Sequence, residues 1–193
     1  MQRPIWSYVV QWGLWAVIMY ATFRWVARSR EKAGRSAEPG ALFHPPAMLI
    51  IGIACSGFFI AIAILSWIYP GKDGSPALSL AFLAFALLGV PMVLDWRNAR
   101  HAVSETGMRF GTMMGAGGEF SWGQVTSVDF SHSMKWFVLL IGDGRKVRVS
   151  LMLTGLPEFA RQVLAHVPPA VITPSAQAVL EPTAAGNPPS PWG

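Results

Sequence analysis

Two long apolar runs dominate the pattern of hydrophobic and polar positions along the chain. They extend from Ala47 to Tyr69 and from Ala77 to Leu94, contain no charged residue, and are separated by only seven residues. A helix of 23 residues rises about 35 Å, which is enough to cross a hydrocarbon core of about 30 Å. The pattern therefore predicts two membrane-spanning helices joined by a short turn, with a kink at Pro91 near the end of the second helix.

A third apolar stretch, from Ile5 to Phe23, comes before these runs and has Gln11 as its only strongly polar side chain. A cleaved signal peptide is the alternative for this stretch. However, its positive charges follow the apolar part instead of preceding it, and no A-x-A-like cleavage site ends it. We therefore expect three transmembrane helices, at about 5–23, 47–69 and 77–94.

Basic residues are concentrated between the first and second of these stretches. They are Arg24, Arg28, Arg30, Lys32 and Arg35. The turn between the second and third stretches has only Lys72, so the positive-inside rule predicts a cytoplasmic location for the basic segment. The N-terminus is then outside and everything after Asp95 is cytoplasmic. The five basic residues are also candidate contacts for anionic lipid head groups or a partner.

Beyond Arg97 the pattern changes to short segments of strand type separated by turn residues. Six strands are expected, at about 99–104, 108–113, 119–122, 124–131, 134–141 and 146–151. The fifth is apolar on nearly both faces, which predicts burial on both. Asp143 and Gly144 predict a tight hairpin turn before the sixth, in which apolar and polar residues alternate.

A C-terminal helix is expected after the strands. Its apolar residues recur at helical spacing: Leu156, Phe159, Ala160, Val163, Leu164 and Val167. Pro157 and Glu158 suit the first turn of a helix, which would cover the preceding sheet. The remaining segment contains seven prolines and only one charged residue, Glu181, so we expect a disordered or extended tail. The predicted divisions are thus a membrane domain at 1–96, a strand-rich domain at 97–167 and a Pro-rich tail at 168–193.

Composition supports the membrane class. Hydrophobic residues make up 52% of the chain and charged residues only 13%, against about 25% charged in a soluble domain. The net charge of +5 does not imply nucleic-acid binding, because the basic residues lie mostly where membrane topology places them. The single cysteine, Cys55, excludes an internal disulfide.

Several short motifs resemble those of one known family. The segments Val103–Phe110, Phe120–Val128 and Leu140–Val149, with the helix that follows them, are similar to the bacterial pleckstrin-homology-like (PH-like) domain membrane proteins. This resemblance implies a partly open β-barrel of about seven strands, capped by a C-terminal helix and placed after transmembrane helices. It also implies a multi-pass protein of the bacterial inner membrane. Trp122 in the S-W-x-x-V segment is expected to be a core anchor.

A second basic group lies at the hairpin of the last two strands. It consists of Arg145, Lys146 and Arg148, which are further candidate contacts for anionic lipid or for a protein partner. Near the first hairpin the chain offers only Arg100 and Arg109. The basic cluster that phosphoinositide-binding members of the wider superfamily carry there is therefore missing.

Residues that would indicate catalysis or metal binding are dispersed. The four histidines, His44, His101, His132 and His166, do not have the i, i+4 spacing of a helical metal pair. The carboxylates of the strand-rich part fall mostly at expected turns, and the apolar runs contain no ionisable residue that would mark an ion path. We therefore expect no catalytic residue, no metal and no cofactor.

The leading hypothesis from the sequence is a non-enzymatic inner-membrane protein whose cytoplasmic domain mediates protein–protein association. An accessory subunit of a larger membrane complex is one form of this, with a protein partner or a second copy as well as membrane lipids in contact. Two alternatives are an anionic-lipid-sensing membrane protein and a membrane-embedded lipid-modifying enzyme. The enzyme would need a cavity at the membrane surface with converging polar side chains.

Overall fold

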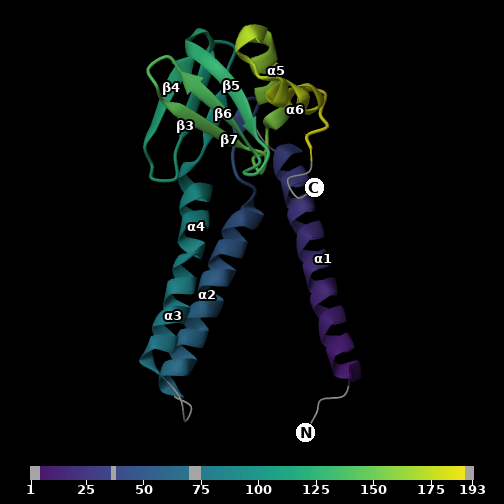
Figure 1. The fold of residues 1–193 in the computed structure, drawn as a ribbon, viewed down its shortest axis with the longest axis vertical. Helices are drawn as coiled ribbons and strands as arrows, with labels where there is room; N and C mark the ends of the chain where they lie inside the picture. Colours follow the sequence, from purple (N-terminus) through teal and green to yellow (C-terminus); the bar gives the residue numbers. More distant parts are fainter. Residues whose placement is uncertain (1–4, 36–37, 70–74, 190–193) are drawn as a thin grey trace.

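The computed structural model describes residues 5–35, 38–69 and 75–189. Figure 1 shows long helices that run from one end of the molecule to a strand-rich domain at the other end. Two short helices, α5 and α6, lie against one side of that domain. The arrangement separates an apolar helical part from a small folded domain, as the sequence pattern predicts.

The first helix, α1, is longer than the predicted span. It covers Ile5–Arg35, so the basic residues expected in a loop continue the helix instead. The reason is local: from Phe23 to Ala33 there is no proline or glycine, and Arg, Ala, Lys and Glu are good helix formers. In Figure 1, α1 diverges from α2 and α3 toward the end far from the domain.

Two helices are long and apolar enough to cross a membrane in the described residues. One is α2, Pro46–Ile68, and the other is formed by α3, Pro76–Leu87, followed directly by α4, Gly89–Asn98. Both agree closely with the predicted boundaries. The helix over the third predicted stretch, α1, is less apolar, because tryptophans, tyrosines and Gln11 interrupt it.

The second of these helices is interrupted at Leu88, three residues before the proline at which a kink is predicted. Pro91 lacks the N–H that would bond to the carbonyl of Leu87, and its ring crowds that carbonyl. The Leu88 N–H bonds instead to the Phe85 carbonyl, three residues back, at 3.1 Å. The break therefore lies one turn before the proline and divides the helix into α3 and α4.

Small residues allow α2 and α4 to pack closely. A Cβ atom on Gly89 would lie 2.2 Å from Ser56 Oγ and 2.6 Å from the carbonyl oxygen of Gly52. Ser56 Oγ also donates a hydrogen bond to the carbonyl of Ala86 at 2.9 Å. Close backbone approach with interhelical hydrogen bonds is typical of helix packing in membranes, where burial of apolar surface gives no driving force.

The domain contains two antiparallel sheets. The first has the order β1-β2-β3-β4, with strands Ala41–Leu42, His101–Val103, Gly107–Gly111 and Gly117–Ser121. The second has the order β5-β6-β7, with strands Val125–Ser131, Trp136–Ile141 and Lys146–Ser150. The six predicted strands are all present, with small differences at their ends.

The strand missed by the sequence analysis is β1. It has only two residues and precedes α2. The helical hairpin of α2, α3 and α4, which we call the membrane hairpin, therefore separates β1 from its neighbour β2 in the sequence. Leu42 is paired with His101, and Phe43 forms an isolated bridge with Thr154. The edge partner of β2 therefore comes from the segment before the membrane hairpin, on the other side of the expected boundary at residue 97.

The core lies between the sheets and α5, Leu156–His166. On β6 only alternate residues, Phe137, Leu139 and Ile141, are fully buried, so the expected burial of both faces holds for one face and only partly for the other. Trp122, in the short helix η1 (Trp122–Gln124), is a core residue as predicted. Its Nε1–H donates to the Ser104 carbonyl at 2.9 Å.

The expected tail is wrong for most of its length. The segment continues as η2, Pro169–Val171, and α6, Pro174–Ala184, which packs on α5 and β5. Ala176, Val179 and Leu180 are buried. Pro174 occupies the first turn, where its missing N–H costs nothing, and the Thr173 hydroxyl caps the helix by accepting from Ala176 N. Residues 190–193 of the predicted tail lie outside the described residues.

Candidate functional site

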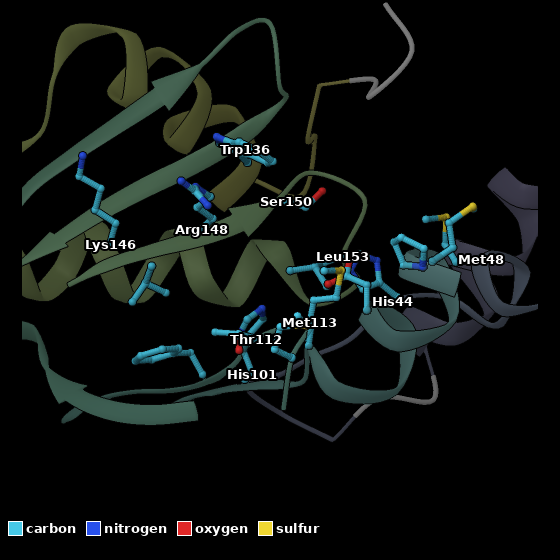
Figure 2. A pocket seen from close by; sticks show the side chains of 18 residues that line it. His44, Met48, His101, Thr112, Met113, Trp136, Lys146, Arg148, Ser150 and Leu153 are labelled. Atoms are coloured by element: carbon cyan, nitrogen blue, oxygen red, sulfur yellow. The ribbon is translucent and has the colours of Figure 1, made fainter. Parts of the chain in front are cut away.

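A cavity of about 520 Å³ lies where the domain meets the ends of α2 and α4. Its walls come from the end of β3 and the following loop, from β6 and β7, and from the domain-side ends of the two helices. Figure 2 shows Lys146 and Arg148 on one side of this cavity, and His44 and Met48 on the other. We call it the junction cavity.

The β7 side of the junction cavity is basic. Lys146 and Arg148 alternate with buried valines on β7, so both side chains point away from the core, as the sequence pattern predicts. The Arg148 guanidinium lies over the Trp136 ring, 5.3 Å from its centroid. In the described part of the chain, no acidic side chain forms an ion pair with Lys146 or Arg148. Their charges are thus available to an anion.

The helix side of the junction cavity is largely apolar. Met48, Pro91 and Met92 line the cavity from α2 and α4, and Met113 and Met114 add two more methionines from the loop that follows β3. Methionine side chains are flexible and polarizable, so they adapt to apolar groups of varied shape. The cavity thus combines a cationic side with an adaptable apolar side.

Two buried histidines line the same cavity near the helix ends. His44 is 5% exposed and His101 is 7% exposed. His44 Nε2 lies 2.8 Å from Asp95 Oδ2, at the end of α4. The pairing of β1 with β2 places Leu42 opposite His101, and this register brings the segment that carries His44 next to His101.

Burial lowers the pKa of His101 to about 4, from an ordinary value of 6.5. The neighbouring His44 lowers it further, and the carboxylate of Asp95 acts in the opposite direction. His101 is therefore neutral at neutral pH. The Nδ1 atoms of His44 and His101 are both buried without a hydrogen-bond partner in the described residues, which is an energetically costly arrangement.

A second cavity, of about 350 Å³, also touches the histidine pair. It is lined by His44 and His101 again, and by Phe43, Trp96 and Arg100. We call it the flank cavity. The two histidines therefore form a wall that the two cavities share.

A third depression is an open, polar groove of about 650 Å³ over β2, β3 and β4. Arg109, Glu119 and Gln124 are among its residues. It is less enclosed than the junction cavity and does not reach the helices. We call it the sheet groove.

The structure separates the basic residues predicted as contacts. Lys146 and Arg148 line the junction cavity, but Arg145 does not, because it forms an ion pair with Asp143 and lies over the Phe110 ring. Arg24, Arg28 and Lys32 are exposed on α1 and line none of the three depressions. The side chains of Arg30 and Arg35 lie outside the described residues.

Sequence reasoning missed the histidine pair, because His44 and His101 are far apart along the chain. A signal was present: each lies just outside an apolar run, at the end of the run that faces the domain. No hydroxyl or thiol of the described residues hydrogen-bonds to the Nδ1 atom of either histidine. Within these residues, neither Nδ1 atom is therefore placed to activate a serine, threonine or cysteine nucleophile. Within the same residues, no group of three His, Cys, Asp or Glu side chains is arranged to hold a metal ion.

Comparison with known proteins adds nothing to this geometry: no family model matches the chain, and no curated protein or solved structure is significantly similar to it.

Proposed function

We propose that the protein is a membrane protein that binds an anionic phospholipid from the adjoining leaflet in the junction cavity. The observation that carries this proposal is that Lys146 and Arg148 share one cavity with four methionines, two of which lie on the membrane-type helices. A phospholipid has the same two parts, an anionic phosphate and apolar chains. This is the lipid-sensing alternative of the sequence analysis, restricted to one site.

The position of the junction cavity supports a lipid over a water-soluble anion. Met48 lies in the first turn of α2, and Pro91, Met92 and Asp95 lie along α4, so both helices line the cavity on the side of the domain. If these helices cross the bilayer, their ends lie at its surface. Each Lys or Arg near an anionic leaflet contributes about 1 kcal/mol of attraction, so Lys146 and Arg148 together favour an anionic headgroup by about 2 kcal/mol.

The topology proposed with this function has three spans and a cytoplasmic domain in the bacterial inner membrane. The direction of α1 supports it, because its N-terminal end lies far from the domain (Figure 1) and Arg24 and Arg28 belong to its C-terminal half. A basic segment at the domain end favours the cytoplasmic side for the domain.

The PH-like character of the domain is also a proposal. Seven strands in sheets of four and three, followed by α5, support it. In this chain the first strand precedes two membrane helices and an additional helix, α6, follows α5. The proposed lipid site lies at the membrane-facing end of the domain, away from the first hairpin of the four-stranded sheet.

The lipid proposal is tested by measuring the phospholipids that copurify with the full chain in mild detergent. We expect anionic lipid to be enriched over its share of the membrane, and the double variant K146Q/R148Q to lose most of that enrichment. R109Q, which removes an arginine of the sheet groove, is the matched control and should keep it. Equal lipid profiles for the wild type and K146Q/R148Q would reject the proposal.

Protein association by the domain, the leading hypothesis from the sequence, is a second candidate function. The sheet groove supports it, because Arg109 and Glu119 offer both charges on an open surface. Here R109Q should weaken cross-linking to a neighbouring protein in native membranes, whereas K146Q/R148Q should not. Both proposed functions are non-enzymatic.

A further inference from the structure

The flank cavity is smaller than the junction cavity but likewise combines a basic side chain with an apolar lining. Arg100 precedes β2 and its guanidinium lies over the Trp96 ring, 5.8 Å from the centroid. Leu42, Phe43 and Pro46 complete an apolar lining. At about 350 Å³, the flank cavity is within the usual range of about 300–1,000 Å³ for ligand sites.

We propose that the flank cavity is a second site for an anionic phospholipid, with its phosphate on Arg100. This goes beyond the proposed function, which concerns only the junction cavity. An arginine stacked on an aromatic ring keeps the edge of its planar guanidinium free for two parallel hydrogen bonds to a phosphate. In the described part of the chain, no carboxylate forms an ion pair with Arg100.

The membrane supplies the occupant, because the flank cavity also opens at the helix ends. Pro46 is the first residue of α2, and Trp96 lies in the last turn of α4. Tryptophan prefers the headgroup level of a bilayer, where its ring is apolar and its N–H is wet. A phosphate at Arg100 would therefore be at headgroup depth with its acyl chains alongside the helices.

The two sites are separate but adjacent. His44 and His101 line both cavities, so both proposed lipids would contact the histidine pair. Arg100 belongs to the flank cavity alone, and Lys146 and Arg148 belong to the junction cavity alone. Substitutions can therefore remove the cations of one site and leave those of the other.

Native mass spectrometry of the full chain, released from nanodiscs of phosphatidylglycerol and phosphatidylcholine, counts the bound anionic lipids. We expect two on the wild type, one on R100Q, one on K146Q/R148Q and none on the triple variant. The control R97Q removes the neighbouring exposed arginine, which lines neither cavity, and should keep two.

Two bound lipids on R100Q, or one on R97Q, would overturn the second site. A loss in R100Q with no loss in K146Q/R148Q would support the second site and reject the proposed function at the junction cavity. Excess soluble glycerol phosphate distinguishes the source of the phosphate: displacement of the Arg100-dependent lipid would overturn the assignment to a membrane lipid. Equal thermal unfolding midpoints of R100Q and R97Q show that R100Q is folded.

Discussion

At the scale of single residues, His101 is buried in a position that favours its neutral form. Its pKa is about 4 in the folded protein and about 6.5 when the chain is unfolded. Between these pH values the unfolded chain binds more protons than the folded chain. The stability that neutral His101 contributes is therefore fully present above pH 6.5 and is lost as the pH falls toward 4. The lowering of this pKa corresponds to roughly 3 kcal/mol.

We therefore expect the thermal midpoint of the full chain in detergent to fall between pH 6.5 and pH 4. H101Q should flatten this dependence, because glutamine carries no proton to gain. H166Q is the matched control, since His166 is exposed at the end of α5 and should leave the slope unchanged. A slope that is equal in all three proteins would show that His101 is not responsible.

At the scale of elements, the contact between α2 and α4 depends on Gly89. Its Cβ position is occupied by Ser56 Oγ and by the backbone of Gly52, so even alanine forces the two helices apart. We expect G89A to lose about 1–3 kcal/mol of stability, measured by thermal unfolding in detergent. G57A is the control on α2, because a Cβ there meets no atom within 4 Å, and it should be close to neutral.

The position of α6 depends on Asp129 of β5. One oxygen of its carboxylate, Oδ1, accepts hydrogen bonds from the Thr173 and Ser175 hydroxyls at 2.8 and 2.9 Å. These bonds, with that from the Phe130 amide, lower the pKa of Asp129. Because the pKa of Asp129 is lowered in the folded state, these hydrogen bonds contribute their full stability at a pH above the ordinary pKa of an aspartate. This contribution is lost as the pH falls through the lowered pKa.

We expect D129A to reduce amide hydrogen-exchange protection in α6 by roughly fivefold, which corresponds to about 1 kcal/mol. D143A, at the exposed hairpin turn, removes a carboxylate that does not contact α6 and should leave this protection unchanged. If D129A exchanges like the wild type, the carboxylate does not hold α6.

The same helix shows where sequence reasoning failed at this scale. Seven prolines after residue 167 indicate a chain without regular structure, but Pro174 lies at the helix start, where proline is favoured. Ala176, Val179 and Leu180 follow at helical spacing, yet this signal is short and weak beside the prolines. In contrast, α2 and α5 could be predicted, because uninterrupted apolarity and a regular apolar stripe depend on local residues alone.

At the scale of the whole molecule, the sequence predicts the membrane helices and six strands, but not the junction cavity. Lys146 and Arg148 are identifiable as a basic face, and both line the junction cavity. The histidine pair, His44 and His101, is not identifiable from the sequence, because it depends on the pairing of β1 with β2 across the whole membrane hairpin. Contacts between residues that distant leave no periodicity in the sequence.

The pairing of β1 with β2 also defines the smallest part that should fold alone. A fragment of residues 97–189 lacks β1 and exposes the edge of β2, so we expect it to aggregate. A chain of residues 38–45 joined by a short Gly-Ser linker to residues 99–189 restores that edge, since Leu42 and His101 are neighbours. Size-exclusion chromatography and thermal unfolding compare the two; equal behaviour would show that β1 is dispensable.

The two-residue strand β1 has a consequence for how the protein is made. During synthesis Ala41 and Leu42 leave the ribosome before the membrane hairpin, whereas their partners on β2 leave after it. The first sheet therefore cannot be completed until both helices of the hairpin exist. Completion of the strand-rich domain would then report that both helices of the hairpin have formed with their two ends side by side.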